Sequence, residues 1–324
     1  MPGTWQEHGY GVAHYTIRVA GYAIGSPGKL RSRRQIRLWR AAPACIVSFA
    51  LMVMRMTSSN RIRIGIGGWS YEPWRRTFYP ATVPKKSELQ FASRKLTAIE
   101  VNSTFYRSQS PAVFAKWRNE TPDDFVFTLK APRFVTNRRV LGEARETMTN
   151  FLNSGIGELG AKLGPLLWQL PPGKVFVPAD VERFFRLLPD QLGQLRLRHA
   201  FEVRHDSFMC EEYVALARQF RVTTVFADSN EYPRFADVTG DFIYARLMNT
   251  ASSELTGYPE KDLSDWSKRL RTWAAGKEPA DLPRVAAPSA KAKHRDVFAF
   301  FISGAKERAP AAAMETISLL KSID

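Results

Sequence analysis

From residue 61 onward, short runs of β-branched and aromatic residues alternate with segments in which apolar residues recur at helical spacing. The apolar runs predict eight strands, at 61–66, 97–102, 125–130, 166–170, 199–203, 222–227, 242–247 and 297–302. The segments between them predict helices at 88–95, 112–119, 142–159, 179–187, 211–220, 263–274 and 311–322. The connection 228–241 is too short and too rich in Pro and Gly for a helix. Strands that alternate with helices indicate parallel strands joined by crossover connections.

The number of strands favours a closed barrel over an open sheet. Eight strands in about 265 residues match the usual size of a (β/α)₈ barrel. A doubly wound sheet more often has about five or six strands and an early glycine-rich phosphate loop, and the run Gly65-Ile66-Gly67-Gly68 lacks the GxGxxG spacing. We therefore predict an α/β fold: a single TIM-like (β/α)₈ barrel over residues 60–324, in which 275–296 form a mobile basic loop.

The first 59 residues differ from the rest of the chain. A basic run at 31–40 precedes an apolar stretch at 41–54, which is the order of a secretory signal peptide, but the apolar stretch lies far from the N-terminus and no clear cleavage site follows it. A translation start at Met52, Met54 or Met56 would make these residues spurious, and a third interpretation is a disordered or membrane-touching arm. We predict a disordered or spurious N-terminal extension that takes no part in the barrel.

Charge and composition narrow the classes of function. Lys and Arg number 47 against 31 Asp and Glu, a net charge of +16, but the first 59 residues hold eight of those cations and one acid. The body is therefore moderately basic. No apolar stretch reaches the roughly 20 residues of a membrane-spanning helix, and two cysteines with five scattered histidines give no CxxC or HxxxH zinc pattern. We expect a cytoplasmic protein with no metal, no other cofactor and no membrane partner; the oligomeric state stays open.

Polar residues, which are unfavourable to bury, and aromatic residues occur where the predicted strands end. In TIM-like barrels the chemistry lies at the carboxyl ends of the strands. Seven of the eight predicted strands lead into such residues, in chain order Trp69, Tyr71 and Trp74; Glu100 and Asn102; Thr128 and Lys130; Trp168 and Gln169; Glu202, Arg204 and His205; Asp228; and Tyr244 and Arg246. Side chains two residues apart share a face of a strand. Four of these strands therefore direct a pair of polar side chains to one rim.

The charged rim has two interpretations, because a charge on a barrel strand is expensive to bury unless it is paired or faces a wet cavity. In the first, a structural salt-bridge network of Glu100, Lys130, Glu202, Arg204 and Arg246 closes the top of the barrel. In the second, which we favour, the same charges form the floor of a ligand cleft. The wall of that cleft would be aromatic: Trp69, Tyr71, Trp74, Phe105 and Tyr106.

Three residues are candidates for proton transfer or covalent chemistry. Glu100 and Glu202 could act as acid and as base or nucleophile, with a separation that sequence does not give. His205 lies three residues past Glu202, and a histidine near neutral pKa suits proton transfer, although a histidine just past a strand end is more often a hydrogen-bonded loop residue. With carboxylates as its remaining ligands, a metal site built on His199 and His205 is the weaker interpretation.

A family resemblance begins at these same residues. The run 64–71 with Trp74 and 78–80, then 100–106, Trp117, 121–122, 125–127 and Lys130, and the blocks 163–172, 202–208, 244–247, Tyr258 and 296–313 resemble the YecE-like family, domain of unknown function family 72. The resemblance covers roughly residues 61–320. It implies a TIM-barrel-like fold and a start near Met56, and it supplies no activity. The family is similar in architecture to metal-dependent sugar isomerases and to zinc endonucleases, but this chain lacks their dense set of metal ligands.

Two hypotheses for function follow. In the first, an anionic small molecule, phosphorylated or sugar-like, is held at the barrel rim by a metal-independent enzyme of the hydrolase or isomerase type or by a binding protein. Lys130, Arg204 and Arg246 would bind the anion. Asn102 and Gln169 would orient the ligand, and Trp69 and Tyr71 would stack on it. Tyr106 and Asp228 complete the predicted substrate-binding residues. In the second, the basic surface and the aromatic residues bind nucleic acid.

Overall fold

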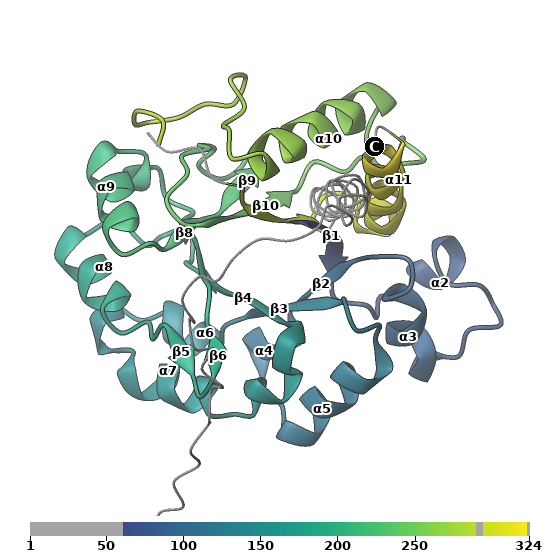
Figure 1. Ribbon diagram of the computed structural model, residues 1–324, viewed down its shortest axis with the longest axis horizontal. Helices are drawn as coiled ribbons and strands as arrows, with labels where there is room; N and C mark the ends of the chain where they lie inside the picture. The colour runs from purple at the N-terminus through teal and green to yellow at the C-terminus, as the bar shows by residue number, and fades with distance from the viewer. Residues whose placement is uncertain (1–60, 290–293, 323–324) are drawn as a thin grey trace, which may run out of the picture. The chain divides into compact units, whose positions relative to one another are not determined.

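Parallel strands form the centre of the described chain, which comprises residues 61–289 and 294–322 of a computed structural model (Figure 1). The predicted extension 1–59 lies outside these residues. The strands of the main sheet are β1 (Ile62–Gly67), β2 (Ala98–Val101), β3 (Val126–Lys130), β4 (Leu163–Gln169), β7 (His199–Glu202), β8 (Thr223–Thr224), β9 (Phe226–Asp228), β10 (Phe242–Leu247) and β11 (Asp296–Phe301). Their order is β8-β7-β4-β3-β2-β1-β11-β10-β9, and every neighbouring pair is parallel.

One chain segment joins the two edges of this sheet. β8 pairs with β7 and β9 pairs with β10, but only Val225 separates β8 from β9 along the chain. The Val225 amide donates to the Phe201 carbonyl at 3.0 Å and so continues the pairing with β7. The sheet therefore closes into a barrel of eight chain segments at the eight predicted positions. The predicted TIM-like barrel is confirmed.

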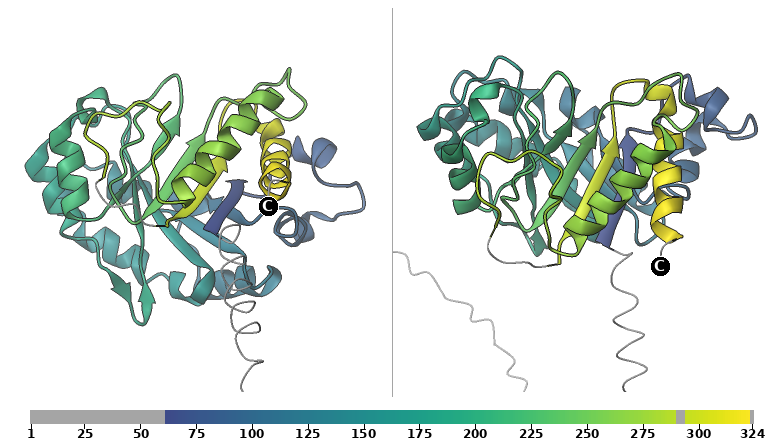
Figure 2. Two further views of the ribbon diagram at one scale, coloured as in Figure 1. Left: turned by 45° about the horizontal axis from the view of Figure 1, so that its top comes forward. Right: turned by 90° about the horizontal axis from the view of Figure 1, so that it is seen from above.

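Helices surround the barrel and follow the predicted alternation (Figures 1 and 2). They are α2 (Trp74–Thr77), α3 (Glu88–Ala92), α4 (Ser103–Tyr106), α5 (Pro111–Glu120), α6 (Arg133–Thr136), α7 (Arg145–Leu152), α8 (Pro178–Phe185), α9 (Glu211–Gln219), α10 (Glu260–Ala274) and α11 (Ala309–Lys321). Short 3₁₀ turns lie between them: η2 (Lys85–Ser87), η3 (Leu141–Glu143), η4 (Ile156–Lys162), η5 (Asp206–Phe208) and η6 (Lys306–Arg308). The connection 229–241 contains no helix, as the sequence predicts.

Two local predictions need correction or addition. The single helix predicted over 142–159 is wrong, because the segment is divided into η3, α7 and η4. Gly155, at φ 106°, breaks it, since that left-handed backbone cannot continue a right-handed helix. A small antiparallel hairpin of β5 (Gln191–Leu192) and β6 (Leu195–Arg196) was not predicted, and strands of two residues are too short to produce a period.

Alternate strand residues build two separate cores. Inside the barrel, Ala98, Leu167, Ala200 and aromatic side chains such as Phe300 pack together, whereas the isoleucines of β1 face the outer helices. Gly65 lies on the inner face, where a Cβ atom would come within 2.1 Å of the Ala98 carbonyl oxygen. Because glycine has no side chain there, β1 and β2 can approach each other closely. The inner core fills the barrel near the amino ends of the strands, and polar groups occupy the carboxyl ends.

Hydrogen bonds join part of the loop predicted over 275–296 to the connection that follows β9. The buried carboxylate of Asp237 accepts hydrogen bonds from the backbone amides of Val285 and Ala286, both at 2.9 Å. The Ala236 amide donates to the Pro283 carbonyl at 2.7 Å. These bonds fix residues 283–286 against the barrel.

Candidate functional site

A buried guanidinium bridges two buried carboxylates at the carboxyl ends of three strands. Arg246, near the end of β10, donates from Nε and Nη2 to the two carboxylate oxygens of Glu100 on β2, at 3.2 and 3.1 Å. Its Nη1 donates to Oε2 of Glu202, the last residue of β7, at 2.7 Å. Both carboxylates are fully buried and Arg246 is 3% exposed. The bidentate geometry is the strong form of an arginine–carboxylate pair.

Neutral side chains complete the hydrogen bonding of these carboxylates. The Tyr244 hydroxyl donates to Glu100 Oε2 at 2.8 Å and lies 3.0 Å from the hydroxyl of Thr128 on β3. The side-chain amide of Gln169, at the end of β4, donates to Glu202 Oε2 at 2.8 Å. All of these groups are buried. The network thus joins polar residues of the four strands for which period-2 alternation predicted a common rim, and Gln169 of β4 adds a fifth strand.

Arg204 is the second cation on Glu202 and remains partly open to solvent. Its Nε donates to Glu202 Oε1 at 2.8 Å, and its side chain is 16% exposed. The guanidinium carbon lies 4.2 Å from the ring centroid of Tyr232, whose hydroxyl accepts from Nη1 at 3.3 Å. Among the described residues, no hydrogen bond engages Nη2 of Arg204. One edge of this guanidinium is therefore available to a ligand.

The electrostatics of the network favour the charged forms of Glu202 and Arg246. Burial alone would raise the pKa of Glu202, but Arg246 and Arg204 outweigh it and hold that pKa below its usual value. Burial would lower the pKa of Arg246, and the two carboxylates raise it instead. Burial together with the charge of Glu100 raises the pKa of Tyr244 well above its ordinary value, so this phenol stays a hydrogen-bond donor.

Lys130 is the third cation, and it has no carboxylate of its own. It is 7% exposed at the end of β3, and its Nζ lies 3.9 Å from the ring centroid of Phe105. Across the described part of the chain, no hydrogen bond or ion pair joins this ammonium to another residue. Burial lowers the pKa of Lys130 to about 8, and the positive charge of Arg246 adds to the effect.

A cavity of about 520 Å³ opens between the ends of β1 and β2 and the helix α5. Trp69, Asn102 and Trp117 line it, together with the cations Arg107 and Lys306. The rings of Trp69 and Trp117 meet edge to face at 5.1 Å, and the backbone carbonyl of Trp69 accepts a hydrogen bond from the Tyr79 hydroxyl, which fixes this loop. The cavity therefore offers an indole, an amide and two cations to a ligand.

Four predicted residues lie apart from the network. His205 caps η5: its Nδ1 accepts from the Ser207 amide at 3.2 Å and pairs with the Ser207 hydroxyl at 2.9 Å. Asp228 is buried beside Arg234, 3.2 Å away, and burial raises its pKa against that cation. Tyr71 lies under the Lys306 ammonium, 4.4 Å from its ring centroid, and Tyr106 is 65% exposed.

The sequence analysis missed part of the cavity lining. Lys306 and Arg107 were not candidates, and neither was Gln109, whose side-chain nitrogen is enclosed without a hydrogen-bond partner in the described structure. Lys306 follows the eighth strand, which is the one strand whose carboxyl end we left without a candidate. In TIM-like barrels the functional residues follow the carboxyl ends of the strands, and applying this rule to the eighth strand would have identified Lys306.

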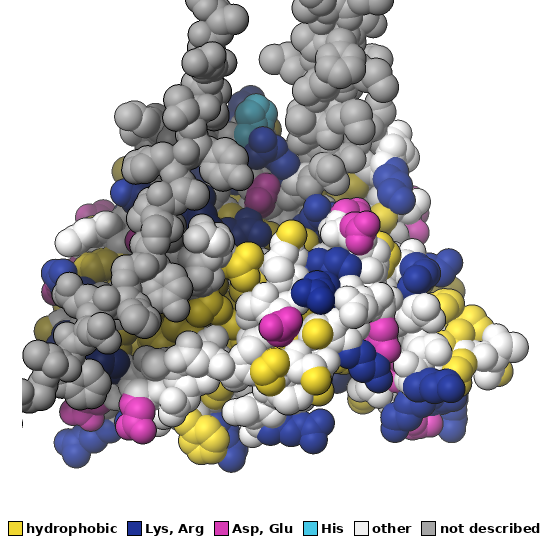
Figure 3. All heavy atoms as spheres, turned by 60° about the horizontal axis from the view of Figure 1, so that its bottom comes forward, with side chains coloured by type: hydrophobic (Ala, Val, Ile, Leu, Met, Phe, Trp, Pro, Cys, Tyr) yellow, Lys and Arg dark blue, Asp and Glu magenta, His cyan; other side chains and the backbone are white. Residues whose placement is uncertain are grey.

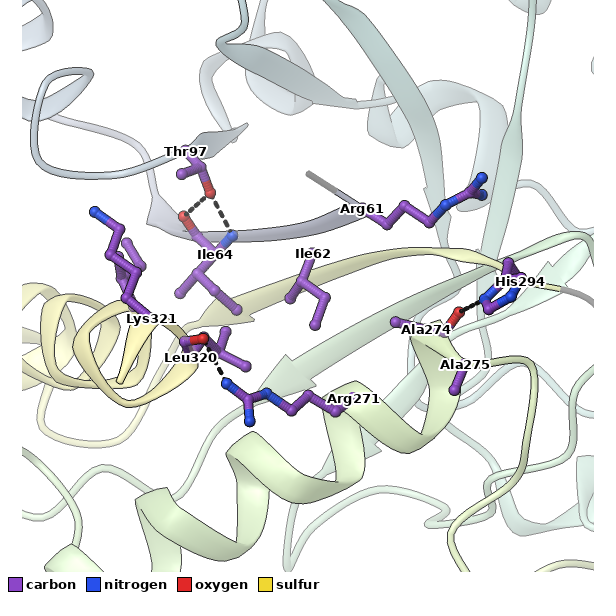
Figure 4. A pocket seen from close by; sticks show the side chains of 11 residues that line it. Arg61, Ile62, Ile64, Thr97, Arg271, Ala274, Ala275, His294, Leu320 and Lys321 are labelled. Carbon is purple, nitrogen blue, oxygen red and sulfur yellow. Dashed lines mark hydrogen bonds between the residues drawn. The ribbon is translucent and has the colours of Figure 1, made fainter. Parts of the chain in front are cut away.

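A second cavity, of about 270 Å³, lies at the opposite end of β1 between α10 and α11 (Figure 4). Its walls are mostly apolar, and its polar groups bind the backbone around it. Arg271 donates to the Leu320 carbonyl, His294 Nδ1 lies 3.3 Å from the Ala274 carbonyl, and the Thr97 hydroxyl pairs with the amide and carbonyl of Ile64. These contacts join α10 to α11 and to the residues before β11, and they join β1 to the residue before β2. The charged network lies at the other end of the strands.

No group of three or more His, Cys, Asp or Glu side chains within 61–289 and 294–322 is placed to hold a metal ion. In the same part of the chain, no helix combines the length and the apolar character needed to cross a bilayer.

A closed parallel barrel with its charged groups at the carboxyl ends of the strands places the chain among TIM-barrel-like proteins. The chain belongs to the family described as "Protein of unknown function DUF72", whose profile matches residues 63–323. The predicted family resemblance is thereby confirmed.

Relatives and solved structures agree with this assignment. The chain is 30% identical over 173 residues to the UPF0759 protein YecE of Escherichia coli K12, covering 52% of this chain and 59% of YecE. It is 29% identical over 122 residues to the UPF0759 protein YunF of Bacillus subtilis 168, covering 34% of this chain and 40% of YunF. A DUF72 family protein from Thermotoga maritima MSB8 has a similar structure, with a TM-score of 0.60 and 21% identity over 81% of this chain and 98% of that one. The matches to YecE and YunF span less than two thirds of those proteins.

Proposed function

We propose that the mouth of the barrel binds an anionic small molecule that carries a phosphate or carboxylate group and a planar or sugar-like part. The observation that supports this most directly is the imbalance of charge in the buried network. Three cations, Lys130, Arg204 and Arg246, face two carboxylates, Glu100 and Glu202. An anion would supply the missing charge.

The partners of each cation indicate where the anion would bind. Nε, Nη1 and Nη2 of Arg246 all bind carboxylate oxygens, so this residue is positioned to hold the network together. The Lys130 ammonium and the open edge of Arg204 are the groups with capacity for a further acceptor. Charge-assisted hydrogen bonds from such groups to phosphate or carboxylate oxygens are the strong kind. We therefore assign anion binding to Lys130 and Arg204.

The neighbouring cavity would hold the rest of the ligand. Trp69 offers an aromatic face and edge, Asn102 offers an amide donor and acceptor, and Lys306 adds a cation on the far side. A volume of about 520 Å³ is within the range of small-molecule sites. Glu100 and Glu202 remain the candidates for proton transfer.

Calorimetric titration with inorganic phosphate and with pyrophosphate tests this proposal. We expect Lys130→Met to weaken binding about tenfold or more, because one charge-assisted hydrogen bond contributes roughly 1.5–3 kcal/mol. Lys116→Met is the matched control, since Lys116 is 64% exposed on α5, and its affinity should equal that of the wild type. Titrations near pH 8 in buffers of different ionisation heat should also show proton uptake, because a bound anion would raise the pKa of Lys130 from about 8. Equal binding by all three proteins would contradict the proposal.

Nucleic acid is the alternative ligand, and the same experiment can identify it. On the face drawn in Figure 3, the Lys and Arg side chains of the described residues lie in separate groups between hydrophobic and uncharged ones. A single-stranded oligonucleotide that binds more tightly than pyrophosphate, loses affinity steeply with salt and requires Trp69 would favour that ligand.

A further inference from the structure

Two buried lysines of this protein have different surroundings. Lys162 and Lys130 are each 7% exposed, and burial lowers the pKa of both. The Lys162 ammonium donates to the carbonyl oxygens of Arg118 and Thr121, at 2.6 and 2.7 Å, which occupies and orients it. For Lys130, the described residues provide no such acceptor. The two nitrogens therefore differ in their hydrogen-bond partners: Lys162 has two carbonyl acceptors, and Lys130 has none among the described residues.

The residues that face Lys130 keep its nitrogen free. Glu100 and Glu202 are the nearby carboxylates, and Arg246 bridges both of them. Arg204 pairs with Oε1 of Glu202. The Phe105 ring covers one side of the ammonium. Lys130 keeps 7% of its surface exposed, so it is not completely sealed from solvent.

We propose that Lys130 is a nucleophilic amine that forms an imine with an aldehyde or ketone carbon of the bound anion. This inference rests on the proposed anion site and names its substrate class: a carbonyl compound that carries phosphate or carboxylate. The neutral Nζ attacks the carbonyl carbon, and a carbon–nitrogen bond forms. The carbonyl oxygen then leaves as water with the two amine protons, and the C=N bond remains. No oxidant, reductant or metal is needed to balance this step.

The protein favours the neutral amine that this step requires. An ordinary lysine with a pKa of about 10.4 is neutral in roughly one molecule in 2,500 at pH 7. At a pKa of about 8, roughly one molecule in ten is neutral. Arg204 and Arg246 remain charged at the same pH, and the open edge of Arg204 can hold the anionic group of the substrate. Their charge also stabilises a neutral nitrogen over an ammonium.

Reductive trapping on the full-length protein tests the inference. Glyoxylate, an anionic aldehyde, and propanal, a neutral one, are each incubated with the protein at pH 7, reduced with borohydride and mapped by peptide mass spectrometry. We expect Lys130 to be modified at least about tenfold faster than Lys162 or the exposed Lys116, and faster by glyoxylate than by propanal. Modification of surface lysines with none at Lys130 would overturn the inference.

Lys130→Arg separates this inference from the proposed function. Arginine keeps the positive charge and cannot form the imine, so this variant should retain phosphate binding and lose the trapped product. Phosphate binding by the wild type without trapping would reject the imine and leave the anion site in place. Trapping of propanal at Lys130 in a wild type that binds no phosphate would reject the anion site and support the amine. A thermal melt equal to that of the wild type verifies the fold of the variant.

Discussion

Replacing Arg246 with Met will lower the free energy of unfolding at pH 7 by about 3–5 kcal/mol, because the change leaves two buried carboxylates without their shared cation. Glu100 would retain Tyr244, and Glu202 would retain Gln169 and Arg204, but no other described residue bridges the two carboxylates. Urea denaturation followed by tryptophan fluorescence measures the loss. Arg186→Met is the control: Arg186 forms an exposed ion pair with Glu182, and such pairs contribute about 0–1 kcal/mol.

The loss in Arg246→Met should depend on pH in a defined direction. The folded pKa of Glu202 lies below its unfolded value, so the stability it contributes is present above about pH 4.3 and is lost as the pH falls through the folded pKa. In the variant, protonation removes the unpaired charge. The difference between wild type and variant should therefore shrink below about pH 4. A difference that is small at pH 7, or that stays constant down to pH 3, would show that Arg246 does not neutralise these carboxylates.

The strand positions could be predicted from the sequence because strand runs and helical periods are local patterns. The short hairpin of β5 and β6 gave no such pattern, and the helix predicted over 142–159 is divided after η3 and again at Gly155, whose backbone angle depends on the fold. The strand-end rule and period-2 alternation brought Glu100, Lys130, Glu202 and Arg246 to one rim, which the structure shows. The partner of each charge could not be predicted, because strand tilt and stagger decide which residues reach the same level.

Asp228 is a strand-end residue whose direction could not be predicted from the sequence. It lies two residues after Phe226, so the two side chains share a face of the strand. Phe226 packs against Trp266 and Trp273 of α10, outside the barrel. Asp228 accordingly lies on the outer side, near Arg234, and takes no part in the buried network. Phe226 alone could not have indicated this direction, because Phe298 and Phe300 face the interior of the same barrel.

Replacing Lys130 with Met should, in contrast, stabilise the protein at pH 7. Holding the ammonium in the barrel mouth costs free energy, because its pKa is lowered to about 8 from an unfolded value of about 10.4. That difference corresponds to about 3 kcal/mol at most, and the lost contact with Phe105 reduces the gain, so we expect an increase of about 1–3 kcal/mol. Urea denaturation measures it, with Lys116→Met as the exposed control that should not change.

The pH profile of Lys130→Met connects stability to function. The cost of the buried charge is fully present below about pH 8 and disappears as the pH rises toward about 10.4, because the folded state releases its proton first. Wild-type stability should therefore rise relative to the variant over this interval, and the two should converge near pH 10. A variant that is less stable than the wild type at pH 7 would mean that the protein itself satisfies this ammonium. A variant that is more stable but binds phosphate weakly would show that the buried charge of Lys130 lowers stability and is kept because it binds the ligand. Such a trade-off between stability and activity is expected of a functional residue.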